Sequence, residues 1–151
     1  MNKTYKLIFI LYMFLNISYT KQINEIQILS WNIKMFPFPY GYITKSCIRA
    51  ENIIKSILED PKYDIILFQE AFSEQIREKI FLDLKANYPY QIVPKKNKNI
   101  FLNNNGLWII SKTSISLIDY IIFSQSQGSD RLAVKGANLY LLNFKGQKFY
   151  F

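Results

Sequence analysis

The sequence contains no histidine and a single cysteine among 151 residues, with only five glycines and five prolines. Without histidine, the chain has no imidazole for general acid–base catalysis near neutral pH. Cys47 has no partner for an internal disulfide, which excludes a disulfide scaffold, and its place at the start of a predicted helix indicates a small buried side chain. The shortage of glycine and proline, with 50% apolar residues, excludes a disordered chain and predicts one packed domain.

Basic residues outnumber acidic ones and give a formal net charge of +8 and a pI of about 9.5. Such a charge favours polyanions, phosphate esters or an anionic membrane surface as partners. The densest basic run, "PKKNKN" at 94–99, lies among proline and asparagine and is typical of a solvated loop. The charge alone therefore selects no single partner.

The first twenty residues differ in kind from the rest of the chain. Lys3 and Lys6 precede the apolar run "LIFILYMFLNI" at 7–17, and small residues follow in "SYT" at 18–20. This run has the length of a signal-peptide core and is short for a membrane span. We expect a signal peptide over 1–20, a secreted protein, and a domain over 21–151. An uncleaved N-terminal anchor is the alternative.

Strand and helix patterns alternate along the remaining chain, with helices early and hairpins late. Residues 25–33 and the continuously apolar run 64–68 predict strands, and the run 34–42, with two prolines and a glycine, predicts a loop. Helices are predicted over 47–60, with an apolar face of Ile53, Ile54, Ile57 and Leu58, and from the cap Ser73, with a face of Ile76, Ile80, Phe81 and Leu84. Further strands are predicted at 90–93, 106–111, 116–123, 137–144 and 148–151, which indicates a mixed α+β sheet structure.

The stretch "DIILFQEAF" at 64–72 brings an amide and a carboxylate to the end of a buried strand. In an α/β sheet, the carboxyl ends of neighbouring strands line a common crevice, so Glu70 and Asn32 would meet there. A carboxylate with an amide oxygen suits a hard cation such as Mg²⁺. Taken alone, the stretch is equally consistent with a solvated Gln-Glu at a strand end.

Four motifs in order carry a resemblance to a known family. They are "ILSWNIKMFP", "DIILFQEAF", "NNGLWIISK" and "DRLAVKGANLY". Together they resemble the endonuclease/exonuclease/phosphatase (DNase I-like) superfamily, and within it the secreted bacterial sphingomyelinases C, over residues 26–151. The resemblance implies a four-layer α/β/β/α sandwich, of which this chain holds the N-terminal half, and a divalent cation bound by Asn32 and Glu70.

The same resemblance assigns further residues. Gly106 and Ser111 match the third strand of the family, where they have structural roles, and the glycine allows a close backbone approach. Lys135, before Gly136, matches a position where a lysine could favour the substrate phosphate; a plain surface lysine is the alternative. The tryptophans at 31 and 108 are expected in the core rather than at a choline site.

The aromatic run "FPFPYGY" at 36–42 has two interpretations, contact with a membrane or packing under its own domain. The resemblance also implies a catalytic histidine and aspartate in segments of the "GTH", Asp-x-Asn and Ser-Asp-His types. These would lie beyond Phe151, because the sequence stops inside a predicted strand. We therefore expect a truncated domain that holds the metal-binding part of an active site.

Three hypotheses follow from the sequence. The first is a secreted, Mg²⁺-dependent phosphodiesterase that hydrolyses sphingomyelin to ceramide and phosphocholine at a membrane surface. The second is a DNase I-like nuclease, with nucleic acid as the substrate, which the basic charge also suits. The third is a non-catalytic fragment, or half of a split enzyme that pairs with a separately encoded C-terminal half.

Overall fold

The computed structural model describes residues 25–96, 104–123 and 135–151. The predicted signal peptide over 1–20 lies outside the described residues, as do parts of the basic run at 94–99 and of the motif at 130–140. No helix within the described ranges has both the length and the apolar character needed to cross a membrane.

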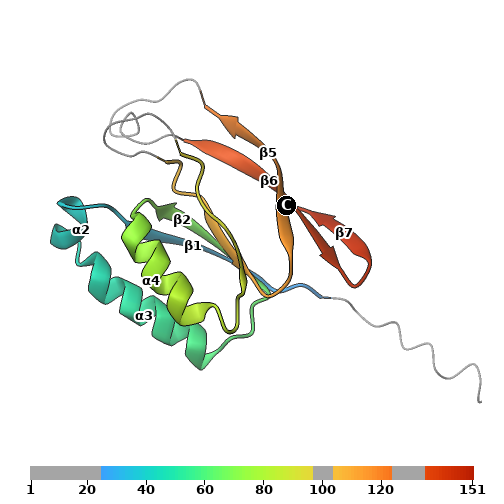
Figure 1. Ribbon diagram of the computed structural model, residues 1–151, viewed down its shortest axis with the longest axis horizontal. Coiled ribbons are helices and arrows are strands. Elements are labelled where there is room, and N and C mark those ends of the chain that lie inside the picture. Colours follow the sequence, from blue (N-terminus) through green and yellow to red (C-terminus); the bar gives the residue numbers. More distant parts are fainter. Residues whose placement is uncertain (1–24, 97–103, 124–134) are drawn as a thin grey trace, which may run out of the picture.

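The described elements follow the predicted order (Figure 1). All the predicted strands and both predicted helices are present, and one short helix, α2, lies where the sequence predicted a loop. The elements are β1 (Ile28–Met35), α2 (Tyr40–Ile43), α3 (Ser46–Glu59), β2 (Ile65–Ala71), α4 (Glu74–Leu84), β3 (Tyr90–Ile92), β4 (Trp108–Ser111), β5 (Ile115–Ile122), β6 (Gly136–Phe144) and β7 (Gln147–Tyr150).

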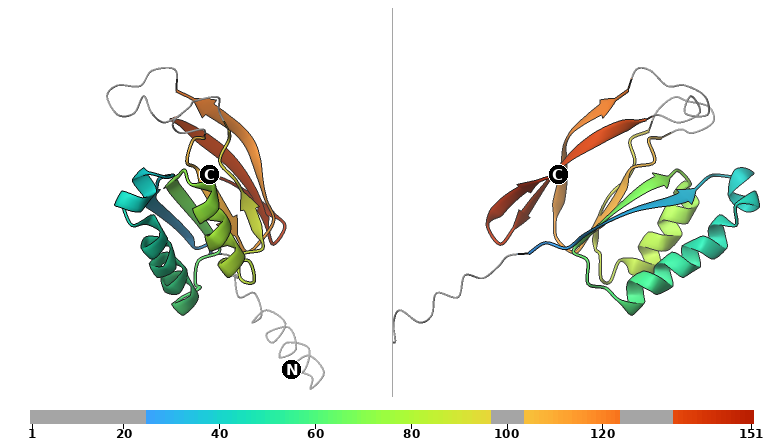
Figure 2. Two further views of the ribbon diagram at one scale, coloured as in Figure 1. Left: turned by 60° about the vertical axis from the view of Figure 1, so that its left-hand side comes forward. Right: turned by 180° about the vertical axis from the view of Figure 1, so that it is seen from behind.

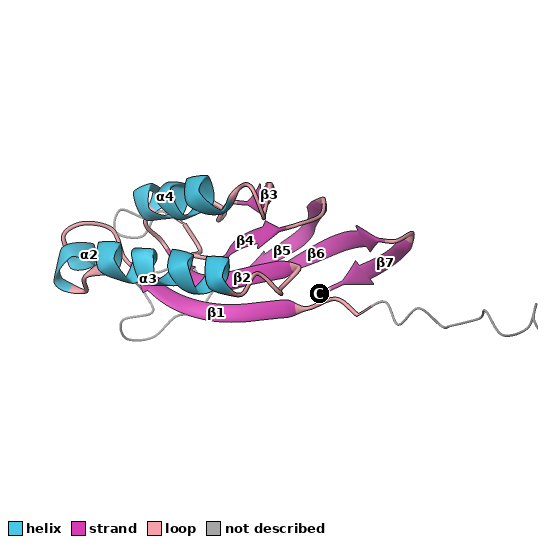
Figure 3. Ribbon diagram, turned by 90° about the horizontal axis from the view of Figure 1, so that it is seen from below, coloured by secondary structure: helices cyan, strands magenta, loops and turns pink. Residues whose placement is uncertain are grey.

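Two sheets and one helix layer make up the described part of the chain. The first sheet has the order β1-β2-β4-β3, with β2 parallel to β1 and antiparallel to β4, and the second has the antiparallel order β5-β6-β7. The helices α3 and α4 cover one face of the first sheet, and the second sheet lies on its other side (Figures 2 and 3). These are three successive layers of the predicted four-layer sandwich.

The central strand β2 has apolar residues on both faces. On the helix side, Ile66 and Phe68 join the core formed with α3 and α4, and Phe68 stacks on Trp108 with ring centroids 4.8 Å apart. On the other side, Ile65 packs in the core shared with the second sheet. The predictions of a strand covered on both faces and of a core position for Trp108 are confirmed; Trp31 packs, partly buried, against the helix-side core.

Two helix positions were predicted wrongly as buried. Cys47 and Leu58 are exposed, whereas the buried residues of α3 are Ser46, Ala50, Ile53, Ile54 and Ile57. Each exposed residue follows a buried one directly, and one step along an α-helix turns the side chain by about 100°. That turn carries Cys47 and Leu58 off the face that packs against the sheet.

The start of α4 agrees with the prediction of a capped helix. The side chain of Ser73 accepts a hydrogen bond of 3.4 Å from the backbone N–H of Ile76, which satisfies one of the free donors of the first turn. The backbone N–H of Ser73 itself donates to the carbonyl of Met35 at 2.9 Å. These contacts fix the start of α4 against the end of β1.

Candidate metal site at the ends of β1 and β2

The ends of β1 and β2 are joined through an irregular register. Asn32 pairs with Gln69, but the next matched pair is Met35 with Ala71, so two residues of β1 lie opposite Glu70 alone. This is a β-bulge, which bends a strand and changes the direction of its side chains. The bulge lies at the two residues that the sequence placed at a common crevice.

Glu70 adopts a backbone conformation that is rare for its residue type. Its φ is 53°, in the left-handed region. In a regular strand, Glu70 would point to the helix side with Phe68, because alternate residues share a face. Instead its carboxylate accepts a hydrogen bond of 2.8 Å from the side-chain amide of Asn32. The bulge and the positive φ together bring these two side chains into contact.

The side-chain amides of Asn32 and Gln69, which lie next to Glu70, each make a further hydrogen bond. The Asn32 side-chain oxygen accepts a hydrogen bond of 3.2 Å from the backbone N–H of Lys34, so the amide presents its nitrogen to Glu70. Gln69 donates to the Ser30 hydroxyl at 2.8 Å. Gln69 therefore has a structural contact between the two strands, and Glu70 provides the carboxylate of the site.

The donor set of this site fits a hard cation that keeps most of its water. Glu70 is half-buried and Asn32 is exposed, so both are within reach of solvent. Among the described residues, no group of three or more His, Cys, Asp or Glu side chains forms a metal cluster. Mg²⁺ is commonly bound by one or two carboxylates, with waters and substrate phosphate completing its coordination. Glu70 fits that role, and direct ligation by Asn32 stays a prediction.

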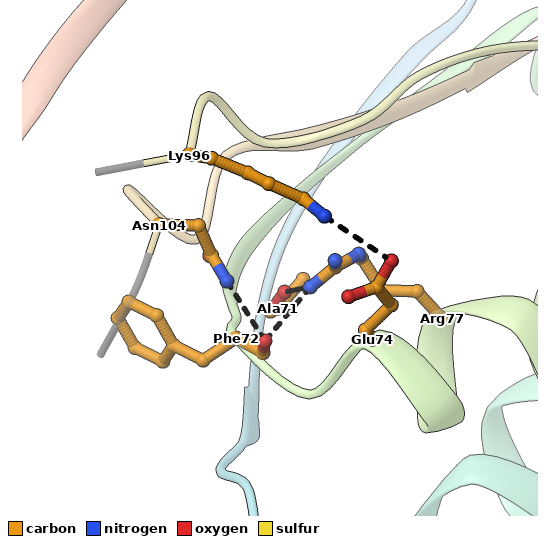
Figure 4. Close-up of polar contacts among 6 residues, drawn as sticks. All are labelled: Ala71, Phe72, Glu74, Arg77, Lys96 and Asn104. Carbon is orange, nitrogen blue, oxygen red and sulfur yellow. Dashed lines mark hydrogen bonds and ion pairs between the residues drawn. The ribbon is translucent and has the colours of Figure 1, made fainter. Parts of the chain in front are cut away.

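A buried arginine fixes the chain immediately after Glu70 (Figure 4). Arg77 is only 6% exposed, and its guanidinium donates to the backbone carbonyls of Ala71 and Phe72. Burial lowers the pKa of the Arg77 guanidinium from its ordinary value. Asn104 also donates to the carbonyl of Phe72, at 3.0 Å. The two side chains thus provide hydrogen-bond partners for carbonyls at a buried part of the chain.

Gly106 lies against the same segment. Its carbonyl accepts a hydrogen bond of 3.0 Å from the N–H of Ala71. Its φ is +66°, and an added Cβ would lie 2.7 Å from the ring of Phe72. The predicted close backbone approach at Gly106 is confirmed. Ser111, at the end of the strand β4 that follows Gly106, is buried and accepts a bond of 3.2 Å from the N–H of Thr113.

A cavity of about 270 Å³ lies between the two sheets beside the site, and its lining includes Gln69, Gly136, Asn138 and Tyr140. The Asn138 side-chain amide donates to the Tyr140 hydroxyl at 2.7 Å. Burial raises the pKa of the Tyr140 phenol, and the hydrogen bond from Asn138 opposes part of that rise. The cavity therefore has a few neutral polar groups set in a mainly apolar wall, which includes Leu67, Leu107 and Phe151.

Lys135 lies immediately before β6, as the sequence predicted. It directly precedes Gly136, and Glu70 directly follows Gln69, so each charged residue adjoins a residue that lines the same cavity. Lys135 is exposed. Its predicted action on a substrate phosphate stays a prediction.

Comparison of sequences supports the resemblance. The chain is 33% identical over 141 residues to sphingomyelinase C 2 of Leptospira interrogans serogroup Icterohaemorrhagiae serovar Lai (strain 56601), an alignment that covers 83% of this chain and 22% of that protein. The chain thus spans about a fifth of the length of that relative. No protein-family model matches the chain.

Comparison of structures defines the fold class. A crystal structure of beta toxin from Staphylococcus aureus with bound magnesium ions matches with a TM-score of 0.69 and 21% identity, over 84% of this chain and 48% of that one. An endonuclease/exonuclease/phosphatase family protein from Leptotrichia buccalis matches with a TM-score of 0.55 and 18% identity, over 83% and 52%. The described layers are thus about half of a DNase I-like fold.

Sequence and fold point to the same group of proteins. The chain has a DNase I-like fold, shared with an endonuclease/exonuclease/phosphatase family protein, and its sequence resembles that of a bacterial sphingomyelinase C.

Proposed function

We propose that the whole protein is a secreted, Mg²⁺-dependent phosphodiesterase of the sphingomyelinase type, which hydrolyses sphingomyelin to ceramide and phosphocholine. The observation that carries the proposal is the hydrogen bond of 2.8 Å between Asn32 and Glu70 at adjacent strand ends. The 33% identity to a sphingomyelinase C supports the choice of substrate. The apolar leader over 1–20 supports export.

In this proposal the chain supplies the metal-binding part of the active site. The Glu70 carboxylate holds Mg²⁺, and Asn32 holds that carboxylate in place through its amide nitrogen. A bound Mg²⁺ would polarise the phosphodiester and neutralise charge on its oxygens. The Arg77 clamp on the next two carbonyls keeps Glu70 at a fixed position, which a catalytic site needs.

The proposed reaction also needs a cation that attracts the phosphate and a group that takes the proton of the attacking water. Lys135 attracts the phosphate electrostatically, since it is an exposed cation next in sequence to Gly136, which lines the cavity. None of the 151 residues is histidine. An imidazole that takes the proton of the attacking water must therefore come from outside this chain, in a longer product or a separately encoded half. Sequencing the gene beyond the codon for Phe151 would distinguish these two sources.

A nuclease is the second candidate, because the net charge of +8 favours a polyanion. A non-catalytic fragment is the third candidate. The same metal site would serve either enzyme, so the substrate has to be decided by assay.

The test compares substrates with the full-length gene product. We expect phosphocholine release from sphingomyelin that requires Mg²⁺ and stops with EDTA. Loss of a residue that only supports a metal ligand typically lowers activity by about 10- to 100-fold. Asn32→Ala should lower turnover by an amount within that range, and Glu70→Gln should lower it by more. Glu59→Gln is the matched control, since Glu59 is exposed on α3 and has only a surface ion pair.

Each result of that assay has one meaning. Cleavage of DNA without release of phosphocholine would establish the nuclease. Absence of both activities would establish the non-catalytic alternative. Full activity of Glu70→Gln would contradict the metal assignment, whichever substrate is used.

A further inference from the structure

The segment between β1 and α3 exposes large apolar side chains to an unusual degree. Phe38 is 86% exposed, Tyr42 83% and Ile43 73%. None of the residues of α2 is buried. The alternative that this aromatic run packs under its own domain holds for Phe36, which stacks on Phe72, and is wrong for the exposed rings that follow it. We call the exposed set the aromatic end; it consists of Phe38, Tyr40, Tyr42, Ile43 and Ile48.

The aromatic end is held in place by its own backbone and by one arginine. The N–H of Gly41 donates to the carbonyl of Pro37 at 2.8 Å, and the hydroxyl of Thr44 donates to the carbonyl of Tyr40 at 2.9 Å. The guanidinium of Arg49 donates to carbonyls at both ends of the segment, those of Lys34 and Thr44. A surface that is ordered before binding loses less entropy on contact with a partner.

The aromatic end lies at the same end of the molecule as the candidate metal site. It follows β1 directly, only a few residues after Asn32, and it projects past the ends of β1 and β2 (Figures 1 and 2). A surface that receives the aromatic end would therefore lie next to Glu70.

The charged residues within the segment that carries the aromatic end have one sign. Residues 33–50 contain Lys34, Lys45 and Arg49 and no acidic residue. Both lysines are exposed. Basic side chains beside a membrane-facing segment are attracted by anionic lipid headgroups. Tyrosine favours the boundary between headgroups and acyl chains, because its ring is apolar and its hydroxyl is polar.

We propose that the aromatic end is a membrane-docking surface, which inserts Phe38, Tyr42 and Ile43 into the headgroup region of a bilayer that contains anionic lipid. The proposal extends the proposed function by naming the surface through which the site meets its lipid. Docking in this orientation brings Glu70 to the level of the headgroups, where a phosphodiester lies. A lipid surface fits better than a protein groove, since the exposed Lys34 and Lys45 flank the apolar projection in the sequence.

Vesicle binding of the chain tests the proposal directly. The chain is sedimented with vesicles of phosphatidylcholine and sphingomyelin, with and without phosphatidylserine. Phe38→Ser combined with Tyr42→Ser should lower the partition coefficient by more than about tenfold, because two exposed rings are lost. The matched control combines Leu58→Ser with Leu82→Ser, exposed leucines on α3 and α4, and should leave partition unchanged. Phosphatidylserine should increase binding.

A fluorescent variant gives an independent reading. Tyr42→Trp should show a blue shift of its emission with vesicles, and Leu82→Trp should show none. A double serine variant that binds vesicles as well as the unchanged chain would overturn the proposal. So would an unchanged chain that binds no vesicles, including the case in which the aromatic end instead binds a protein.

Binding without turnover separates this proposal from the proposed function. If the aromatic end is required for vesicle binding but the full-length product releases no phosphocholine, the docking surface stands and the activity fails. If the product hydrolyses sphingomyelin in detergent micelles but vesicle binding ignores the double serine variant, the activity stands and the docking surface fails.

Discussion

At the scale of single residues, the candidate site depends on a strained backbone at Glu70. A residue with a Cβ in the left-handed region costs about 1–2 kcal/mol relative to ordinary helical or extended backbone. Glu70 adopts a φ of 53° with neither glycine nor asparagine at that position. Such strain persists where the surrounding structure determines it, and it gathers at functional sites. Here it places the carboxylate against Asn32.

This strain predicts that two variants of Glu70 differ in stability while both lose metal binding. The free energy of unfolding of Glu70→Asn should be about 1 kcal/mol higher than that of Glu70→Gln, because asparagine tolerates the left-handed region better. Both variants should lose Mg²⁺ affinity, since neither retains a carboxylate. Urea unfolding and calorimetric titration with Mg²⁺ measure the two effects. Equal stability of the two variants would show that the positive φ costs little.

Arg77 is predicted to matter for stability through the carbonyls that it satisfies. Arg77→Met keeps a long apolar stem but leaves the carbonyls of Ala71 and Phe72 without these donors. We expect a loss of about 2–3 kcal/mol in the free energy of unfolding. Lys79→Met, on the exposed side of the same helix, should cost less than about 0.5 kcal/mol. Denaturant unfolding compares the two, and equal losses would contradict the clamp.

Sequence could predict which residues form the site but not how they meet. Glu70 and Asn32 were found because each ends an apolar strand, and that pattern is local. No local sequence pattern predicts the bulge beside Glu70. Glu70 and Lys34 both have a positive φ, yet neither is a residue type that is typical of turns. The burial of Arg77 was missed for a similar reason. Its partners are strand-end carbonyls, which become visible only when α4 is packed.

At the scale of elements, local patterns predicted most of the fold. The continuous apolar run of β2 indicated burial on both faces, and the Ser73 cap fixed the start of α4. The short helix α2 was missed because two prolines and a glycine within 36–42 are typical of a loop. Pairing between the sheets depends on long-range contacts, which no window of sequence contains.

The contact between the sheets predicts a sensitivity to alkali. Tyr140, on β6, is buried against the first sheet, and burial raises the pKa of its phenol above the unfolded value. The neutral form is therefore favoured in the fold, so its contribution is complete below the unfolded pKa of about 10 and is lost as pH rises further. Between pH 9 and 11, Tyr140→Phe should lose less stability than the unchanged chain loses. Circular dichroism follows the unfolding, and parallel pH profiles would contradict this assignment.

At the scale of the whole molecule, the two faces of the second sheet differ sharply. Its inner face packs on the first sheet through Tyr140 and Leu142. Leu139 alternates with these residues and so lies on the outer face, and Ile121 and Tyr150 share that face through their strand pairing. All three outer residues are exposed, Ile121 to 62%. Within the described part of the chain, no helix covers this face.

The exposed outer face predicts that the 151-residue chain associates with itself in solution. Contiguous apolar surface that is open to water favours contact between copies, and the free edges of β5 and β7 add unpaired backbone groups. Ile121→Lys combined with Leu139→Lys should shift the chain toward monomer in analytical ultracentrifugation and weaken binding of a hydrophobic dye. Leu82→Lys on α4 is the matched control and should change neither reading. A chain that is monomeric and binds no dye before substitution would show that this face tolerates water, and would remove the physical reason to expect a covering layer over it.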